Sequence, residues 1–225
     1  MNISPNKILS KSEIQAVIKW HRMGRRQKRL NTQRNFAIWR LSCCCGLRCS
    51  EILGLNLGDF FFKTDKPFIR IRKEITKGHR RPGSSEVIRK PRMVSLSFDQ
   101  GTMQDLQKWL TLRMEQSGGD RSAPFVCGQT AGHVGNRMKR HDVASCWRTA
   151  LQCLGVDRAR QVSIHGGRHT AITHLIWAGF PLPWVRDFAG HANIATTSIY
   201  THLCDETVLP TNVYGVEAVK LKVVA

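Results

Sequence analysis

The spacing of apolar residues predicts helices along most of the chain. Residues 10–20 place Ile14 and Val17 on one face, and Ser10 with Glu13 three positions later forms a capping-box pattern at the start. A second apolar stretch ends at Gly46, a residue type that is common at helix ends. The helices expected on this basis cover residues 10–20, 36–45, 50–55, 101–116, 133–154, 165–178, 181–189 and 194–200.

One segment has a different pattern. Apolar and basic residues alternate from Phe68 to Arg72 and again from Val87 onward, and Pro82 and Gly83 lie in the polar stretch between the two runs. Alternation with turn residues in between predicts a β-hairpin. The expected fold is therefore mainly α with a small antiparallel β-sheet (α+β), organised around one core.

The chain carries 35 Lys and Arg against 16 Asp and Glu, a formal net charge of +19. The excess is uneven, since residues 1–92 hold 22 basic and 6 acidic residues. A basic surface can serve solubility alone, but a polyanion with a phosphate backbone accounts better for so uneven an excess. The run of basic residues between the first two expected helices is the candidate surface for phosphate contact: Arg25, Arg26, Lys28 and Arg29.

The eight cysteines do not suggest a metal site or disulfides. Three are consecutive, Cys43 to Cys45, and none of the others forms a C-x-x-C pair. We expect them to be buried hydrophobic side chains, and we expect no metal and no cofactor. The sequence has no apolar run of about 18 residues and no secretory signal pattern, so a cytoplasmic protein associated with DNA is the expectation.

Residues 164–203 concentrate the chemistry, with five of the nine histidines and one of the two tyrosines. His165 and Arg168 are three apart and would share a helix face, and Tyr200 follows His191 by nine positions. Guanidiniums give paired hydrogen bonds to the non-bridging oxygens of a phosphodiester, and an imidazole adds another donor. A tyrosine becomes a nucleophile when a base takes its proton and cations stabilise the phenolate. These residue types indicate chemistry at a phosphodiester.

Three stretches resemble the signature boxes of the tyrosine recombinase, or phage integrase, family. They are GLRCSEILGL (residues 46–55), HGGRHT (165–170) and GHANIATTSIYTH (190–202). The order of the boxes, the Arg-x-x-Glu and His-x-x-Arg forms and the step from His191 to Tyr200 all agree with the family. The resemblance covers residues 9–202 and implies the catalytic domain of that family.

The resemblance also implies roles for individual residues. Tyr200 would attack the scissile phosphate and form a 3′-phosphotyrosyl link, while Arg48 and Arg168 hold the non-bridging oxygens. His191 would add a hydrogen bond to the phosphate, and His165 would accept a proton or donate a positioning hydrogen bond. The family's reaction needs neither ATP nor a metal.

Further residues of the resemblance concern the surroundings of this site. Glu51 would orient the arginine of the first box. The family's hairpin lysine, which protonates the leaving 5′-oxygen, is Lys77 or its rival Lys90, with Lys77 preferred. The remaining histidines of this region match no chemical step and are expected to be structural or close to DNA: His169, His174 and His202.

The expected activity is site-specific DNA recombination on double-stranded DNA by a homotetramer, with no small-molecule substrate and no membrane. Two alternatives remain: relaxation of supercoiled DNA, as by a type IB topoisomerase, and a DNA-binding regulator with the same fold but no chemistry. Relaxation without recombinant products would identify the first alternative. The full set of Arg, His and Tyr residues speaks against the second.

The resemblance also sets the expected domain organisation. Residues 1–208 would form the catalytic domain, and residues 209–225 a tail that can dock elsewhere, for instance on a neighbouring protomer. The family's N-terminal DNA-clamping domain is expected to be absent, which fits either a minimal recombinase or an isolated catalytic fragment. Gly166 and Gly167 depart from the family pattern and would cost about 1–2 kcal/mol of helix propensity, which predicts a more mobile second box.

Overall fold

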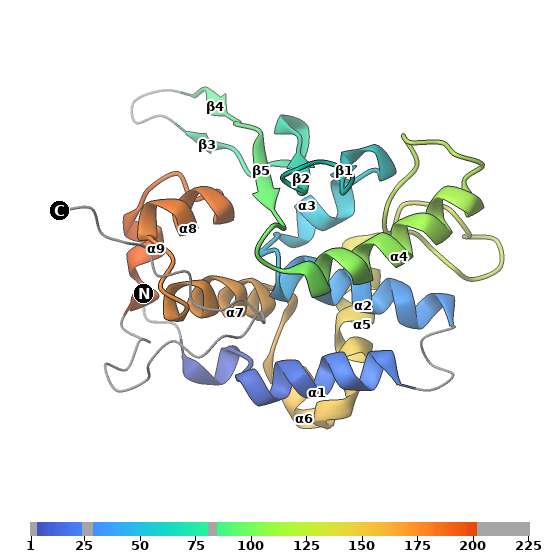
Figure 1. Ribbon diagram of the computed structural model, residues 1–225, viewed down its shortest axis with the longest axis horizontal. Coiled ribbons are helices and arrows are strands. Elements are labelled where there is room, and N and C mark those ends of the chain that lie inside the picture. Colours follow the sequence, from blue (N-terminus) through green and yellow to red (C-terminus); the bar gives the residue numbers. More distant parts are fainter. Residues whose placement is uncertain (1–3, 24–28, 81–84, 202–225) are drawn as a thin grey trace.

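The computed structural model describes residues 4–23, 29–80 and 85–201 (Figure 1). The helices are α1 (Lys11–Arg22), α2 (Leu30–Cys43), α3 (Cys49–Gly54), α4 (Gln100–Gln116), α5 (Arg140–Ala150), α6 (Val156–Gln161), α7 (Ile164–Trp177), α8 (Leu182–Ala189) and α9 (Ala195–Ser198). The strands are β1 (Phe60–Phe61), β2 (Phe68–Ile71), β3 (His79–Arg80), β4 (Val87–Ile88) and β5 (Arg92–Ser95). This mainly helical fold with small antiparallel sheets confirms the predicted class.

The predicted hairpin forms, but as two separate pairs of strands. Strand β2 lies between β1 and β5, with Ile71 opposite Arg92, and Ile69 and Ile71 point into the core. Between the two pairs, residues Lys73–Ile75 form a 3₁₀ turn, so the ladder is interrupted before β3 pairs with β4. Figure 1 shows β3 and β4 extending beyond the three-stranded sheet on the side of α8.

Helix α2 is the centre of the molecule and packs against α4, α5 and α7 (Figure 1). Its second half is buried on all sides, which explains why the apolar stretch from Phe36 predicted a helix there. The helix begins six residues before that stretch, at Leu30, because its first turns are polar and carry no apolar period. Cys43, Cys44 and Cys45 are free and buried, which confirms the structural interpretation of these cysteines.

The prediction of one helix over residues 133–154 is wrong at both ends. Gly135 has φ 82°, a left-handed conformation that ends any helix passing through it, and α5 begins only at Arg140. Gly155, at φ 88°, separates the short 3₁₀ segment Gln152–Leu154 from α6, a helix that the pattern did not predict.

The N-terminal segment is fastened to α7. Ser10 caps α1 as predicted: its Oγ accepts from the Glu13 N–H, and the Glu13 carboxylate accepts from the Ser10 N–H. Just before the cap, the Leu9 N–H donates to Thr170 Oγ1, and the Leu9 carbonyl lies 2.8 Å from Nε2 of His174. His174 is therefore a structural residue, as expected.

The glycine pair at the start of α7 is explained by close packing. A Cβ on Gly166 would lie 2.6 Å from the Lys7 carbonyl oxygen, and one on Gly167 would lie 2.3 Å from the Trp147 ring. Both glycines are buried inside a continuous helix, whose N-cap Ser163 accepts a hydrogen bond from the Gly166 N–H. The helix can therefore lie against the N-terminal segment and α5 only without side chains at these positions.

Candidate active site

Arg48 lies between α2 and α3, where the first sequence box predicted it. It is the N-cap of α3, and the Glu51 carboxylate accepts from its backbone N–H at 2.8 Å and from its Nη1 at 3.0 Å. Its Nη2 donates to the Gly190 carbonyl at 3.0 Å. The Arg-x-x-Glu spacing thus places the carboxylate under the guanidinium and fixes its direction.

A third arginine, Arg92, completes this cluster, although the sequence pattern did not single it out. It donates from Nη1 and Nη2 to the two oxygens of Glu51, at 2.6 and 3.0 Å, and from Nε to the Phe188 carbonyl. Burial raises the pKa of Glu51, but the charges of Arg92 and Arg48 outweigh burial and hold this pKa below its ordinary value. No local pattern in the sequence distinguishes Arg92 from the other basic residues of the chain.

Arg168, from the second box, is buried in α7 and connects two glycine turns. One amino group donates to the carbonyl of Gly46, and the other donates to the carbonyl of Ala189 at 2.7 Å. Burial lowers its pKa to about 9, and the nearby charge of Arg48 adds to the effect. The two arginines of the sequence motif therefore lie side by side.

His191 follows Gly190, whose left-handed φ of 67° ends α8. Its Nδ1 lies 2.9 Å from Oγ1 of Thr197 in α9. Burial lowers the pKa of His191 to about 3, and the charges of Arg168 and Arg48 contribute next. Burial and these charges thus favour the neutral ring at pH 7, and both arginines are close enough for their charges to act on it.

Tyr200 is buried, with 3% of its surface exposed. Its hydroxyl lies 2.7 Å from Nδ1 of His169, one turn along α7 from His165. Burial raises the pKa of Tyr200, while the charges of Arg168 and Arg48 act in the opposite direction. His169, expected to be structural or close to DNA, instead contacts the predicted nucleophile.

His165 is exposed in the first turn of α7, and its ring lies 4.5 Å from the ring of His169. Burial of part of the ring lowers the pKa of His165, and the charges of Arg168 and Arg48 lower it further. Lys77 also contributes to this shift, which places its ammonium in the same electrostatic neighbourhood.

A groove of about 450 Å³ opens beside the arginine cluster. Its lining includes Arg48, Lys77, Lys90, Arg92 and His191. Both candidate hairpin lysines are exposed and face this groove. Tyr200 does not belong to the groove lining, although His191 and Thr196 from the same segment do, and its hydroxyl contacts His169 instead.

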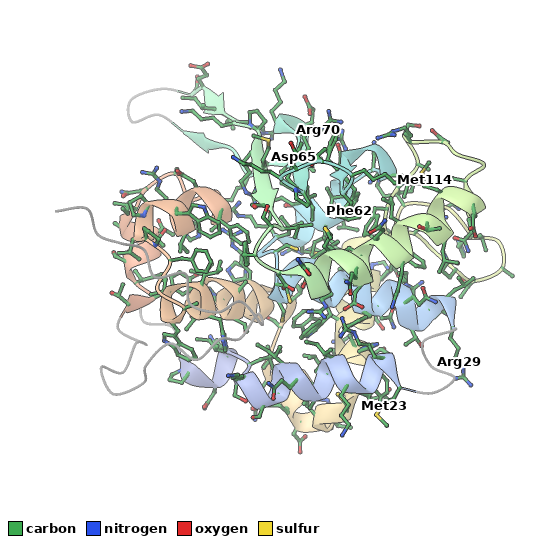
Figure 2. All side chains as sticks on the ribbon, viewed as in Figure 1. Met23, Arg29, Phe62, Asp65, Arg70 and Met114 are labelled. Carbon is green, nitrogen blue, oxygen red and sulfur yellow. The ribbon has the colours of Figure 1, made fainter. Side chains whose placement is uncertain are left out.

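Of the predicted phosphate-contact run, only Arg29 belongs to the described residues. Arg25, Arg26 and Lys28 fall outside the described residues, as does the expected tail over residues 209–225. Arg29 is exposed, and Figure 2 shows it at the end of the molecule opposite α8 and α9. Any contact it makes with DNA is thus remote from Tyr200.

The described residues contain neither a candidate metal site nor a candidate membrane span. Over residues 4–23, 29–80 and 85–201, no three His, Cys, Asp or Glu side chains are grouped so that they could hold a metal ion. In the same ranges, no helix combines the length and the apolar character needed to cross a membrane.

Comparison with known proteins gives the family. Residues 7–207 match the phage integrase family. The tyrosine recombinase XerC of Corynebacterium glutamicum is 32% identical over 176 residues, which cover 78% of this chain and 49% of XerC. The chain thus spans about half the length of the curated relatives it matches.

Solved structures agree on the fold. The XerA recombinase is similar with a TM-score of 0.66 at 22% identity, over 88% of this chain and 59% of that one. The XerH recombinase, bound to a palindromic difH substrate in a post-cleavage complex, has a TM-score of 0.63 at 20% identity, over 90% of this chain and 51% of that one. A family match over most of the sequence and this shared fold show that the chain belongs to the phage integrase family.

Proposed function

We propose that this protein is a site-specific DNA recombinase that cleaves and rejoins strands through a 3′-phosphotyrosyl intermediate. The observation that carries the proposal is the convergence of Arg48, Arg168 and the Tyr200 phenol beside a groove lined by lysines. Family membership supports the same activity, since XerC is a tyrosine recombinase.

In the proposed reaction, the scissile phosphate enters the groove and its non-bridging oxygens accept hydrogen bonds from Arg48, Arg168 and His191. Oη of Tyr200 attacks phosphorus, so the Oη–P bond forms while the bond from phosphorus to the 5′-oxygen breaks. One phosphodiester replaces another, and rejoining therefore needs no ATP. The guanidiniums supply the positive charge that a metal ion supplies in other phosphoryl transfers.

The electrostatics of the site support a phosphate ligand. Burial and mutual repulsion lower the pKa of Arg168 to about 9, and burial with the nearby arginines lowers the pKa of His191 to about 3. Burial is the largest cause of both shifts, and the further contribution of the neighbouring arginines shows that positive charges repel one another in this cluster. A phosphodiester placed there relieves the repulsion, so binding of the anion and protonation of these groups reinforce each other.

Lys77 is the proposed proton donor to the leaving 5′-oxygen, with Lys90 the alternative. Both face the groove, but only Lys77 influences the pKa of His165. On a substrate whose bridging 5′-oxygen is replaced by sulfur, the leaving thiolate needs no proton. We expect Lys77→Ala to cleave ordinary DNA slowly and the sulfur substrate near the wild-type rate; restoration of Lys90→Ala instead would reverse the assignment.

The proposed partner is double-stranded DNA, and the proposed assembly is a homotetramer that holds two duplexes. The net charge of +19 suits the polyanion. The XerH complex with its DNA substrate supports the same ligand for this fold. A tetramer would keep the cleaved ends together for exchange, and the segment 209–225 is a proposed contact between neighbouring protomers.

The test begins with covalent capture, because the DNA site is unknown. Sheared DNA from the source genome is incubated with the protein and denatured, and the fragments that stay attached are sequenced. We expect wild type to capture a discrete site and Tyr200→Phe to capture none. A suicide duplex built on that site then measures single-turnover cleavage, and two copies on a plasmid distinguish recombination from mere relaxation. Equal capture by Tyr200→Phe contradicts the proposal.

A further inference from the structure

We propose, on the basis of the function proposed above, that Nδ1 of His169 accepts the phenolic proton when Tyr200 attacks the phosphate. The sequence boxes assign this histidine no step, and His165 was the expected proton acceptor. The structure separates the two: the Tyr200 hydroxyl lies 2.7 Å from Nδ1 of His169, and no hydrogen bond joins it to His165 within the described residues.

The helix that carries His169 is held in place by the residues on both sides of it. Its neighbour Arg168 is bound to the carbonyls of Gly46 and Ala189, and its neighbour Thr170 accepts from the Leu9 N–H. Both neighbours are buried. Because these contacts prevent α7 from turning about its axis, Nδ1 stays directed at the phenol oxygen.

The protonation states suit a proton acceptor. Burial lowers the pKa of His169 to about 4, and the charges of His165, Arg168 and Lys7 act in the same direction. Burial raises the pKa of Tyr200. At neutral pH the phenol therefore keeps its proton and the neutral imidazole carries a single N–H; in the tautomer with that N–H on Nε2, Nδ1 accepts the hydrogen bond of the phenol.

His165 is better placed for the DNA. It is exposed in the first turn of α7, whereas His169 is partly buried behind it. An exposed ring near Lys77 can donate the positioning hydrogen bond that the resemblance gives as its alternative role, here to a phosphate oxygen, without contact to the phenol. The two histidines thus divide the roles of phosphate contact and proton acceptance.

The step balances as a simple transfer. As the Oη–P bond forms and the bond to the 5′-oxygen breaks, the phenolic proton moves to Nδ1 of His169. The leaving oxygen takes a separate proton, from the proposed Lys77. Rejoining runs in reverse: the 5′-hydroxyl attacks, and the imidazolium returns its proton to the departing phenolate.

Binding of the phosphodiester would switch this base on. The groups that act on the imidazole are His165 and Arg168 from α7, Lys7 from the N-terminal 3₁₀ turn (Pro5–Lys7), His191 after α8, and Tyr200. Four of these five are cations or can become cations, which keeps the imidazole a weak base without DNA. A bound phosphate offsets that charge, so the basicity of His169 rises only when the substrate is in place.

The test compares single-turnover cleavage of the suicide duplex by His169→Ala and His169→Asn. The Asn side chain can accept the same hydrogen bond but cannot take the proton. We expect both variants to be slower than wild type by about 100-fold or more, the usual contribution of general base catalysis. Added imidazole should partly restore the cleavage rate of His169→Ala, in proportion to the unprotonated fraction of the imidazole. It should not change the rate of His133→Ala, an exposed control that we expect to cleave as fast as wild type.

The outcomes separate this inference from the proposed function. If wild type forms no adduct at Tyr200, the proposed function fails. If wild type forms the adduct and His169→Asn cleaves equally fast, the proton-transfer role is refuted and only positioning remains. Thermal unfolding and DNA affinity of each variant show whether slow cleavage arises from misfolding or lost binding.

A measurement without DNA tests the contact itself. The chain has two tyrosines, Tyr200 and Tyr214, so Tyr214→Phe labelled with 3-fluorotyrosine gives one ¹⁹F signal. Acceptance by Nδ1 stabilises the neutral phenol, so His169→Ala should lower the pH at which this signal titrates. An unchanged titration would overturn the proposed hydrogen bond.

Discussion

At the scale of single residues, the site depends on one buried carboxylate shared by two arginines. Glu51 is fully buried and receives Arg48 on one side and Arg92 on the other. The spacing of Arg48 and Glu51 within one helical turn made their contact predictable. Arg92 lies 41 positions from Glu51 and is one of 35 basic residues, so no local pattern marks it.

Arg92→Ala is expected to destabilise the protein and to slow cleavage. Removing one partner of a buried ion pair costs about 3–5 kcal/mol of stability. Because Arg48 still pairs with Glu51 in this variant, we expect a loss near the lower limit of that range. Because Arg48 loses its fixed direction, cleavage should fall more than DNA affinity. Denaturant unfolding and the suicide duplex measure the two effects.

Arg70→Ala provides the control for Arg92→Ala. The buried carboxylate of Asp59 pairs with both Arg70 and Arg72, so Arg70→Ala also leaves a buried carboxylate with one arginine. The difference is that the Arg70 side chain is 48% exposed. An exposed partner contributes about 1 kcal/mol or less. Equal losses of stability in both variants would contradict the importance assigned to Arg92.

Stability should fall as the pH is lowered from 7 toward 4 in the absence of DNA. The pKa of His191 is lowered to about 3 and that of His169 to about 4, so between these values and about 6.5 the unfolded chain binds more protons than the folded one. Each proton that only the unfolded chain binds changes the free energy of unfolding by about 1.4 kcal/mol per pH unit. The measured slope should be smaller, because solvent screens charges at these half-buried rings. His191→Asn should flatten the dependence in denaturant unfolding; an equal slope in both proteins would refute it.

At the scale of elements, the C-terminus of α8 organises the site. Its last carbonyls accept hydrogen bonds from three different arginines: Phe188 from Arg92, Ala189 from Arg168 and Gly190 from Arg48. Terminal carbonyls have no partners within the helix and carry partial negative charge. The end of one short helix therefore gathers the guanidiniums contributed by β5, α7 and the turn before α3.

Gly167→Ala is expected to destabilise the protein by about 1–3 kcal/mol, the usual cost of overpacking a core. The new methyl would lie 2.3 Å from the Trp147 ring and 2.5 Å from Ser42 Oγ, which would displace α7 from α2 and α5. Gly101→Ala, in α4, is the matched control. The atom nearest to a Cβ at this position is Nη2 of the Arg22 side chain, at an ordinary contact distance of 3.6 Å. It should leave stability unchanged or raise it by up to about 1 kcal/mol. Thermal unfolding measures both, and a stable Gly167→Ala would contradict the packing explanation.

At the scale of the whole molecule, charge sets the interaction with DNA. Figure 2 shows the exposed Arg29 at the end of the molecule opposite α8 and α9, whereas the groove beside Arg48 is lined by Gly190 and His191 just after α8, so basic groups occur at more than one place on the molecule. Such a distribution fits a ligand that is itself long and uniformly charged.

DNA affinity should fall steeply with salt. A protein that contacts about 6–10 phosphates loses about 10³–10⁵-fold in affinity between 50 and 200 mM salt, and we expect a slope in that range. Arg29→Ala should reduce the slope of log affinity against log salt by about 0.9, the contribution of one phosphate contact. Fluorescence anisotropy with a labelled duplex measures the slope. An unchanged slope would show that Arg29 makes no contact with a DNA phosphate.

The sequence by itself determined the local features: the capped start of α1, the alternation in β2, and the pairs of residues that share one helical turn, such as Arg48 with Glu51. These follow from the periods of helix and strand, which are written in adjacent positions. Only the tertiary structure decided that Arg92 reaches Glu51, that Arg168 joins two glycine turns, and that the phenol of Tyr200 meets His169 rather than His165. Such contacts depend on how helices pack, and neighbouring residues on one helix point in different directions that no periodicity assigns to a partner.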